Sequence, residues 1–213
     1  MVNTECMNDP AFDTASDTIV GEDYSDARLP GGQWRRQEYV GCTFHDADLS
    51  GLETEAVTFT DCDFTGADLT GSTHSGAAFR NCTFEYTQLR NSTFRNSTFL
   101  GSVFRDCRMR PMTFDEVDFS LTSLGGVDLR KADLSGCRLR EANLVEADLR
   151  ESLLVGADLS GVRAGGLRLD GADLTGARVD AMLWVSASLR GAKIDFGQAL
   201  AYAGAQGLEV VQG

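Results

Sequence analysis

The stretch Asn81–Phe104, "NCTFEYTQLRNSTFRNSTFLGSVF", carries one large apolar side chain at every fifth position. These side chains belong to Phe84, Leu89, Phe94, Phe99 and Phe104. A five-residue repeat suits neither regular element. On an α-helix it rotates the marked residue by roughly 140° each time, and on a continuous strand it alternates between the two faces. The repeat is explained if each unit is one short extended side of a coil, followed by a turn.

This register persists over most of the chain. Units centred on every fifth residue from 39 to 194 number 32, and 29 of the 32 central residues are large and apolar. The exceptions are Thr54, His74 and Ala164. The position two residues before each centre is mostly Ala, Cys, Ser or Thr, which indicates a narrow interior. The position two residues after it is rich in Gly and Asn, which tolerate positive φ and therefore mark the corners.

A second period of twenty residues lies within the first. Phe44, Phe64, Phe84 and Phe104 are spaced by twenty, so four units per coil would stack like residues on a common side. Successive coils would lie about 4.8 Å apart and be joined by backbone hydrogen bonds along the axis. The sequence therefore predicts an all-β fold, a four-sided β-helix of about eight coils.

The chain is predicted to have three parts. Residues 1–33 are acidic and have little apolar surface to bury, so we expect a mostly disordered N-terminal extension. Residues 34–194 form the β-helix. From residue 195 the register is lost, and Asp195 with Gln198 has the spacing of a capping box, which predicts a helix over about 196–206. This helix is expected to cap the open end of the coil, in the segment 195–213.

Charge limits the kind of partner. The formal net charge is −13, which excludes nucleic acid as an attractive ligand because phosphate binding requires clustered Lys and Arg. A protein with a basic groove is favoured instead. The chain begins without a secretory signal and has no stretch of about 18 apolar residues, so we expect a cytoplasmic protein that does not enter membranes.

Catalysis and metal binding are not indicated. A filled interior leaves no water-excluding pocket, so we expect neither an enzyme nor a cofactor. His74 is interpreted as a tolerated polar residue of the core. Cys42, Cys62 and Cys82 form a column at the coil spacing, but no His accompanies them to complete a zinc site, and Cys is also a small buried hydrophobe. A metal or redox protein built on this column is the weaker alternative.

The outer surface is therefore where function is expected. Coil geometry aligns seven acids along one corner, and we call them the acidic ladder: Asp46, Asp48, Asp68, Asp106, Asp128, Glu146 and Asp148. A second corner carries further acids, and five arginines repeat at twenty-residue spacing beside the ladder. An alternative interpretation is a solvated surface on which acids and arginines compensate one another.

Several motifs resemble a known family. "ADLSG", "ADLTG" and "CTFHDADLSG" resemble the pentapeptide repeats, whose fold is a right-handed quadrilateral β-helix. "AFRNCTFEYTQL", "GCRLREANLVEADLR" and the tail after Leu189 resemble the mycobacterial fluoroquinolone-resistance members of that family, over about residues 34–213. Those members bind DNA gyrase as mimics of duplex DNA. The resemblance implies a gyrase-binding protein that modulates supercoiling and protects the enzyme from fluoroquinolones, with the acidic ladder as the contact.

The same resemblance implies two further features. One is a bend of the rod at Pro111, because the relatives carry a proline in a matching "RP" context. The other is a homodimer formed through the C-terminal end, with contacts from Phe196, Ala199, Leu200, Tyr202 and Ala203. A structural scaffold for a different basic protein remains the alternative function, because a fold does not fix its partner.

Overall fold

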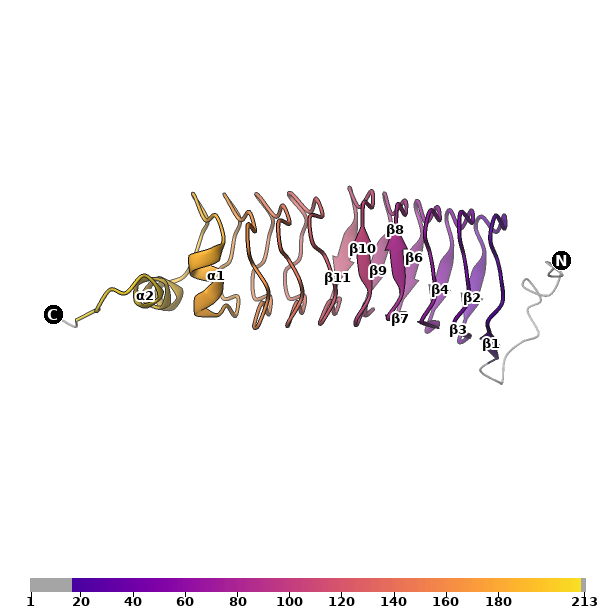
Figure 1. Ribbon diagram of the computed structural model, residues 1–213, viewed down its shortest axis with the longest axis horizontal. Coiled ribbons are helices and arrows are strands. Elements are labelled where there is room, and N and C mark those ends of the chain that lie inside the picture. The colour runs from indigo at the N-terminus through magenta and orange to yellow at the C-terminus, as the bar shows by residue number, and fades with distance from the viewer. Residues whose placement is uncertain (1–16, 212–213) are drawn as a thin grey trace.

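The chain winds into a parallel β-solenoid, closed at its C-terminal end by two short helices (Figure 1). The computed structural model describes residues 17–211. Parallel pairing joins residues twenty apart, and one such ladder runs through nine levels from Thr18 to Arg178. The predicted four-sided β-helix is confirmed.

Each strand is one three-residue side of a coil. Three sheets have the orders β1-β3-β5-β7, β10-β8 and β11-β9-β6-β4-β2. Beyond β11 the sides are paired through isolated bridges. The strands are β1 (Thr18–Val20), β2 (Gln33–Arg35), β3 (Glu38–Val40), β4 (Glu53–Glu55), β5 (Thr58–Thr60), β6 (Thr73–Ser75), β7 (Ala78–Arg80), β8 (Thr83–Glu85), β9 (Thr93–Arg95), β10 (Val103–Arg105) and β11 (Thr113–Asp115).

The core is a stack of aromatic rings. Phe44 lies on Phe64 with ring centroids 4.9 Å apart, Phe64 on Phe84 at 5.0 Å, and Phe84 on Phe104 at 4.7 Å. All four rings are buried. Stacked pairs of this kind contribute about 0.5–1.5 kcal/mol beyond the burial of their area. The predicted column of phenylalanines is confirmed, and it fixes which residues face outward.

The corners lie where the Gly and Asn residues predicted them. At most corners the residue two positions after the centre adopts a left-handed conformation, as Gly66 does with φ of 72° and Asn91 with φ of 61°. Non-glycine residues share this conformation at other corners, including Asp46 and Leu121. A corner side chain therefore points away from the core, into solvent or along the axis.

The solenoid begins earlier than predicted. β1 pairs with β3, and Tyr24 stacks on Phe44 with centroids 5.0 Å apart. The predicted boundary at residue 33 was therefore wrong, because Ile19, Tyr24 and Leu29 continue the five-residue register and complete the first coil. The part of the predicted extension that falls on residues 1–16 lies outside the described residues.

The C-terminal end also differs from the prediction. Helix α1 (Ala181–Ser186) interrupts the last coil and buries Leu183 and Trp184, so the β-helix does not run unbroken to residue 194. The Asp180 carboxylate accepts from the Gly161 N–H, and that of Asp195 accepts from the Gly176 N–H at 3.0 Å. These carboxylates replace the carbonyl groups that a further coil would offer.

Helix α2 (Phe196–Ala205) follows, and its predicted capping box is confirmed. The Asp195 carboxylate accepts from the Gln198 N–H, while the Gln198 side chain accepts from the Asp195 N–H, both at 2.9 Å. The Gln198 amide also donates to the carbonyl oxygens of Leu174 and Ala177, which anchors α2 to the last intact coil. Neither helix of the 17–211 region is long and apolar enough to cross a membrane.

Candidate protein-interaction surface

The acidic ladder occupies one side of the rod and the corner before it. On that side Asp48 is bridged to Asp68 and Asp128 to Asp148, each pair on neighbouring coils. The two pairs are separated by levels that carry Gln88 and Arg108. The remaining members are corner residues with positive φ: Asp46, Asp106 and Glu146. The ladder is thus two short acidic segments rather than one continuous column.

In the N-terminal segment Asp48 and Asp68 are not neutralised by an ion pair among residues 17–211, although Arg28 lies beside Asp48 on the preceding coil. Asp48 accepts from the Ser50 N–H at 3.1 Å and hydroxyl at 2.6 Å, and Asp68 accepts from the Thr70 N–H at 2.8 Å. The bonds from Ser50 hold the pKa of Asp48 below its usual range. No Lys or Arg within residues 17–211 forms an ion pair with either carboxylate. Both therefore present fixed negative charges to a partner.

The C-terminal segment is compensated by arginines. Asp128 binds Arg110 Nη1 at 3.0 Å and Arg130 Nη2 at 2.7 Å. Asp148 binds Arg150 Nη2 at 2.7 Å and Arg168 Nη1 at 3.4 Å. Hydrogen bonds from Arg130 hold the pKa of Asp128 well below its usual range. On this half of the rod the surface matches the alternative interpretation, in which charges compensate one another.

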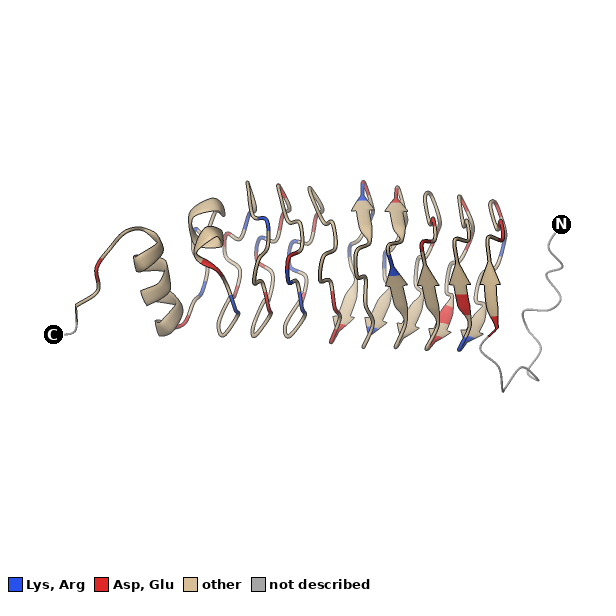
Figure 2. Ribbon diagram, turned by 60° about the horizontal axis from the view of Figure 1, so that its bottom comes forward, with Lys and Arg blue, Asp and Glu red and all other residues tan. Residues whose placement is uncertain are grey.

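The charges divide the rod into zones (Figure 2). Residues 17–76 contain 12 carboxylates and 3 arginines, a net charge of −9. Residues 77–116 contain 4 carboxylates and 6 arginines, a net charge of +2. Residues 117–180 contain 11 carboxylates and 8 basic side chains, a net charge of −3. The negative field is thus concentrated on the coils nearest the N-terminus, where Asp46, Asp48 and Asp68 lie.

The C-terminal end presents an apolar surface. Phe196 is 80% exposed, and Leu200 and Tyr202 are also exposed, whereas Ala199 and Ala203 are half-buried. Met182 and Val185 of α1 add two exposed apolar side chains that sequence reasoning did not identify. Their signal was weak, because Trp184 occupies the five-residue register and hides the change to helix. Large exposed apolar groups at one end of a rod are typical of an interaction site.

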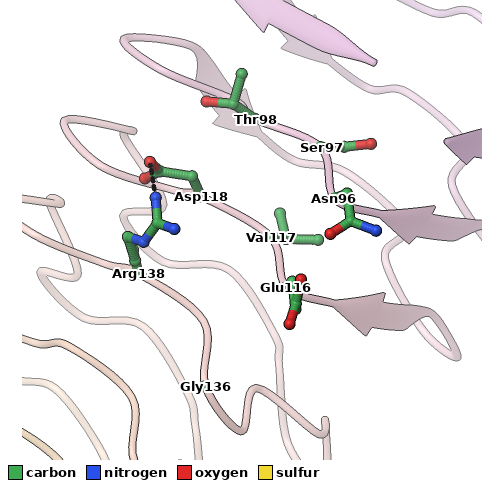
Figure 3. A pocket seen from close by; sticks show the side chains of 8 residues that line it. All are labelled: Asn96, Ser97, Thr98, Glu116, Val117, Asp118, Gly136 and Arg138. Atoms are coloured by element: carbon green, nitrogen blue, oxygen red, sulfur yellow. Dashed lines mark hydrogen bonds and ion pairs between the residues drawn. The ribbon is translucent and has the colours of Figure 1, made fainter. Parts of the chain in front are cut away.

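One cleft of about 380 Å³ opens at a corner near the middle of the rod (Figure 3). Arg138 Nη1 lies 3.3 Å from Asp118 Oδ2 beside it, and the side chains of Asn96, Glu116 and Arg138 are exposed. Such a cleft does not exclude water, as a catalytic pocket requires. It is lined by Asn96, Ser97, Thr98, Glu116, Val117, Asp118, Gly136 and Arg138.

The buried histidine and cysteines have structural partners. His74 Nδ1 lies 2.8 Å from Thr54 Oγ1, and Nε2 lies 2.9 Å from Ser72 Oγ. The thiols of the column at 42, 62 and 82 each donate to a carbonyl oxygen 23 residues earlier, at 3.5 Å. Within residues 17–211, no cluster of three or more His, Cys, Asp or Glu side chains could hold a metal ion.

Pro111 occupies a corner, and its peptide bond with Arg110 is cis. Its carbonyl oxygen still accepts from the Asn91 N–H at 2.6 Å, so the coil that contains it is joined to the preceding coil. A bend of the rod at this residue stays a prediction.

Comparison with known proteins agrees with this architecture. The family model described as pentapeptide repeats matches eight copies, over residues 40–73, 75–110, 118–154 and 152–180. The solved structure of trypsin-treated QnrB1, described as a plasmid-mediated fluoroquinolone resistance protein, has a TM-score of 0.82 and 23% identity. The similarity covers 92% of this chain and 98% of that chain. Full-length QnrB1 has a TM-score of 0.80 at 23% identity, covering 91% and 98%. Curated proteins gave no match. At this identity the likeness to QnrB1 shows a shared fold.

Proposed function

We propose a function from one premise, which is that this chain belongs to the pentapeptide-repeat family. The protein binds DNA gyrase as a mimic of duplex DNA, modulates supercoiling and protects the enzyme from fluoroquinolones. It acts in the cytoplasm as a homodimer, by binding rather than by catalysis, and it does not bind nucleic acid itself. QnrB1 has the same fold and is described as a plasmid-mediated fluoroquinolone resistance protein, which supports this proposal.

The observation that carries the proposal is the pair Asp48 and Asp68. These carboxylates lie on neighbouring coils of one flat side, are held by turn hydrogen bonds and form no ion pair with an arginine among residues 17–211, although Arg28 lies beside Asp48 on the preceding coil. Coils about 4.8 Å apart place successive charges at a spacing that a phosphate-binding groove can match. Complementary fields of this kind raise association rates and give specificity, and they weaken with salt.

Charge density favours one part of the rod for the contact. Duplex DNA carries one negative charge per about 1.7 Å of axis, which the whole rod does not approach. The first three coils, with a net charge of −9, come closest, whereas residues 77–116 are net positive. We therefore place the DNA-mimicking surface on the N-terminal coils, around Asp46, Asp48 and Asp68.

Gyrase supercoiling assays with matched variants test the proposal. Asp48→Asn/Asp68→Asn removes two charges from the proposed contact. Asp158→Asn/Asp173→Asn removes two from other sides, where the carboxylates accept the same kind of turn hydrogen bond from Ser160 and Thr175. We expect the first variant to weaken the effect on gyrase about tenfold or more, and the second to change it less than about threefold.

Two outcomes would contradict the proposal. If wild-type protein at micromolar concentration leaves supercoiling unchanged, gyrase is not the partner, and a scaffold for another basic protein is favoured. If both double variants weaken the effect equally, net charge rather than the N-terminal contact determines binding.

A further inference from the structure

One junction between coils lacks half of its backbone hydrogen bonds. Phe104 N–H still donates to the Ser123 carbonyl oxygen at 2.9 Å, and Phe119 N–H donates to that of Arg138 at 2.7 Å. Between them, no backbone hydrogen bond joins the described segments 106–116 and 125–135. We call this junction the seam. It follows directly after β11, the last strand labelled toward the C-terminal end in Figure 1.

The gap is confined to two adjacent sides of one junction. On the other two sides, bridges join Thr98 to Asp118 and Val103 to Ser123. At the next junction the ladder is complete on the sides that are open in the seam, since Leu129 and Leu134 donate to carbonyl oxygens at 2.8 Å. Two continuous sides facing two open ones have the geometry of a hinge.

The core is also looser at the seam. Cys107 and Met112 are half-buried, whereas Thr87 and Ser92 occupy the same positions one coil earlier and are fully buried. At the junction just before the seam, the rings of Phe94 and Phe114 are 6.4 Å apart, against 4.5 Å for His74 and Phe94 in the same column, so Phe114 at the edge of the seam is also loosely stacked. Looser packing lowers the energy needed to separate the two coils on these sides.

In the described part of the chain, one side-chain ion pair spans the open sides of the seam. Arg110 Nη1 donates to both Asp128 carboxylate oxygens at 3.0 Å, from the coil before the seam to the coil after it. The Arg110 guanidinium is roughly one-third exposed and the Asp128 carboxylate about half exposed, so the pair is accessible to water and salt. Charge-assisted bonds of this type are stronger than neutral ones but are screened by ions.

We propose that the seam is a hinge, with residues 98–103 and 118–123 as its pivot and the Arg110–Asp128 pair as its latch. The two halves of the rod bend toward or away from each other as the open sides widen or close. The N-terminal acidic coils lie on one side of the hinge and the C-terminal helices on the other, so bending changes their relative direction. This inference is independent of the identity of the partner.

Hydrogen exchange tests the hinge, because amides without a backbone acceptor exchange from small local openings. In wild-type protein, the amides of Met109, Phe114 and Asp133 should exchange at least about tenfold faster than those of Leu129 and Leu134. Asp128→Asn should speed exchange in the seam further, by about threefold or more. The matched control is Asp148→Asn, which removes an arginine-paired carboxylate at a junction with a full ladder and should leave local exchange unchanged.

Two results would overturn the proposal. Equal protection of seam amides and of amides one coil later would show that the seam is closed in solution. An Asp128→Asn effect no larger than that of Asp148→Asn would remove the latch. Circular dichroism confirms that each variant keeps its fold, and the exchange of the Phe104 amide, which bonds to Ser123 of the pivot, provides an internal reference.

Discussion

His74 and Thr54 form a hydrogen bond of 2.8 Å between Nδ1 and Oγ1, buried inside a column of aromatic rings. The bond belongs to a series of buried hydrogen bonds in which each donor and acceptor can be assigned. Ser92 donates to the Leu69 carbonyl oxygen and Ser72 donates to Ser92, so Ser72 must accept from the histidine. His74 is therefore neutral with its proton on Nε2, and Nδ1 accepts from the Thr54 hydroxyl.

This geometry predicts strong coupling between the two residues. His74→Phe leaves the Thr54 hydroxyl without its partner, and Thr54→Val leaves Nδ1 without a donor. Each should lower the free energy of unfolding by about 1–3 kcal/mol, because a buried polar group loses its hydrogen bond. The double variant removes both groups and should lose clearly less than the sum. Urea unfolding of the four proteins measures the coupling, and additive losses would argue against the bond.

The buried imidazole also predicts a dependence of stability on pH. Burial lowers the pKa of His74 to about 3, below its ordinary value of 6.5. Between pH 3 and pH 6.5, His74 is therefore protonated in the unfolded chain but neutral in the folded chain. The stabilisation is complete above about pH 6.5 and is lost as the pH falls toward 3, by about 1.4 kcal/mol per pH unit.

Unfolding measured between pH 7 and pH 4 checks this effect. His74→Phe should flatten the decline of stability over that range, whereas substitution of the exposed His45 by Gln should leave it unchanged. An unaltered slope in the His74 variant would mean that carboxylates alone determine the acid sensitivity of the fold.

Substitution of Tyr39 is expected to stabilise the protein. Its ring is stacked on Phe59 with centroids 5.1 Å apart, but its buried hydroxyl has no hydrogen-bond partner among residues 17–211. Tyr39→Phe should raise the free energy of unfolding by up to about 1 kcal/mol, because it removes an unpaired polar group and keeps the stack. The reverse change one coil away, Phe59→Tyr, should lower it. Thermal unfolding distinguishes the two, and a loss of stability in Tyr39→Phe would indicate a hidden partner for the hydroxyl.

Much of this fold is predictable from the sequence because its determinants are local and repeated. The column of Phe44, Phe64 and Phe84 follows from period five within period twenty, and the capping box of α2 follows from Asp195 and Gln198. The same register, traced backward through Tyr24 and Leu29, carried the signal for the missing first coil. The acidic composition of residues 1–33 instead led to the prediction of a disordered extension.

Other features depend on contacts that no short pattern encodes. Helix α1 has an apolar residue, Trp184, at the position where the five-residue register predicts one, so the sequence gives no sign that a helix replaces the coil there. The pairing of Asp128 with arginines on two coils requires knowing how side chains extend across the surface. The seam is defined by hydrogen bonds that fail to form between segments about twenty residues apart, and apart from Pro111 the residues on either side look like ordinary repeat units.

The exposed apolar end predicts the assembly of the proposed homodimer. A twofold contact buries the same residue twice, so each change at Phe196 acts on both subunits. Phe196→Asp should weaken association by at least about a hundredfold, since burial of one phenylalanine contributes about 1.5–3 kcal/mol. Val20→Asp places the same charge on an exposed apolar residue at the opposite end and should leave association unchanged. Sedimentation of the three proteins at micromolar concentrations measures this. Dimers that survive Phe196→Asp, or that are lost in Val20→Asp, would place the contact elsewhere.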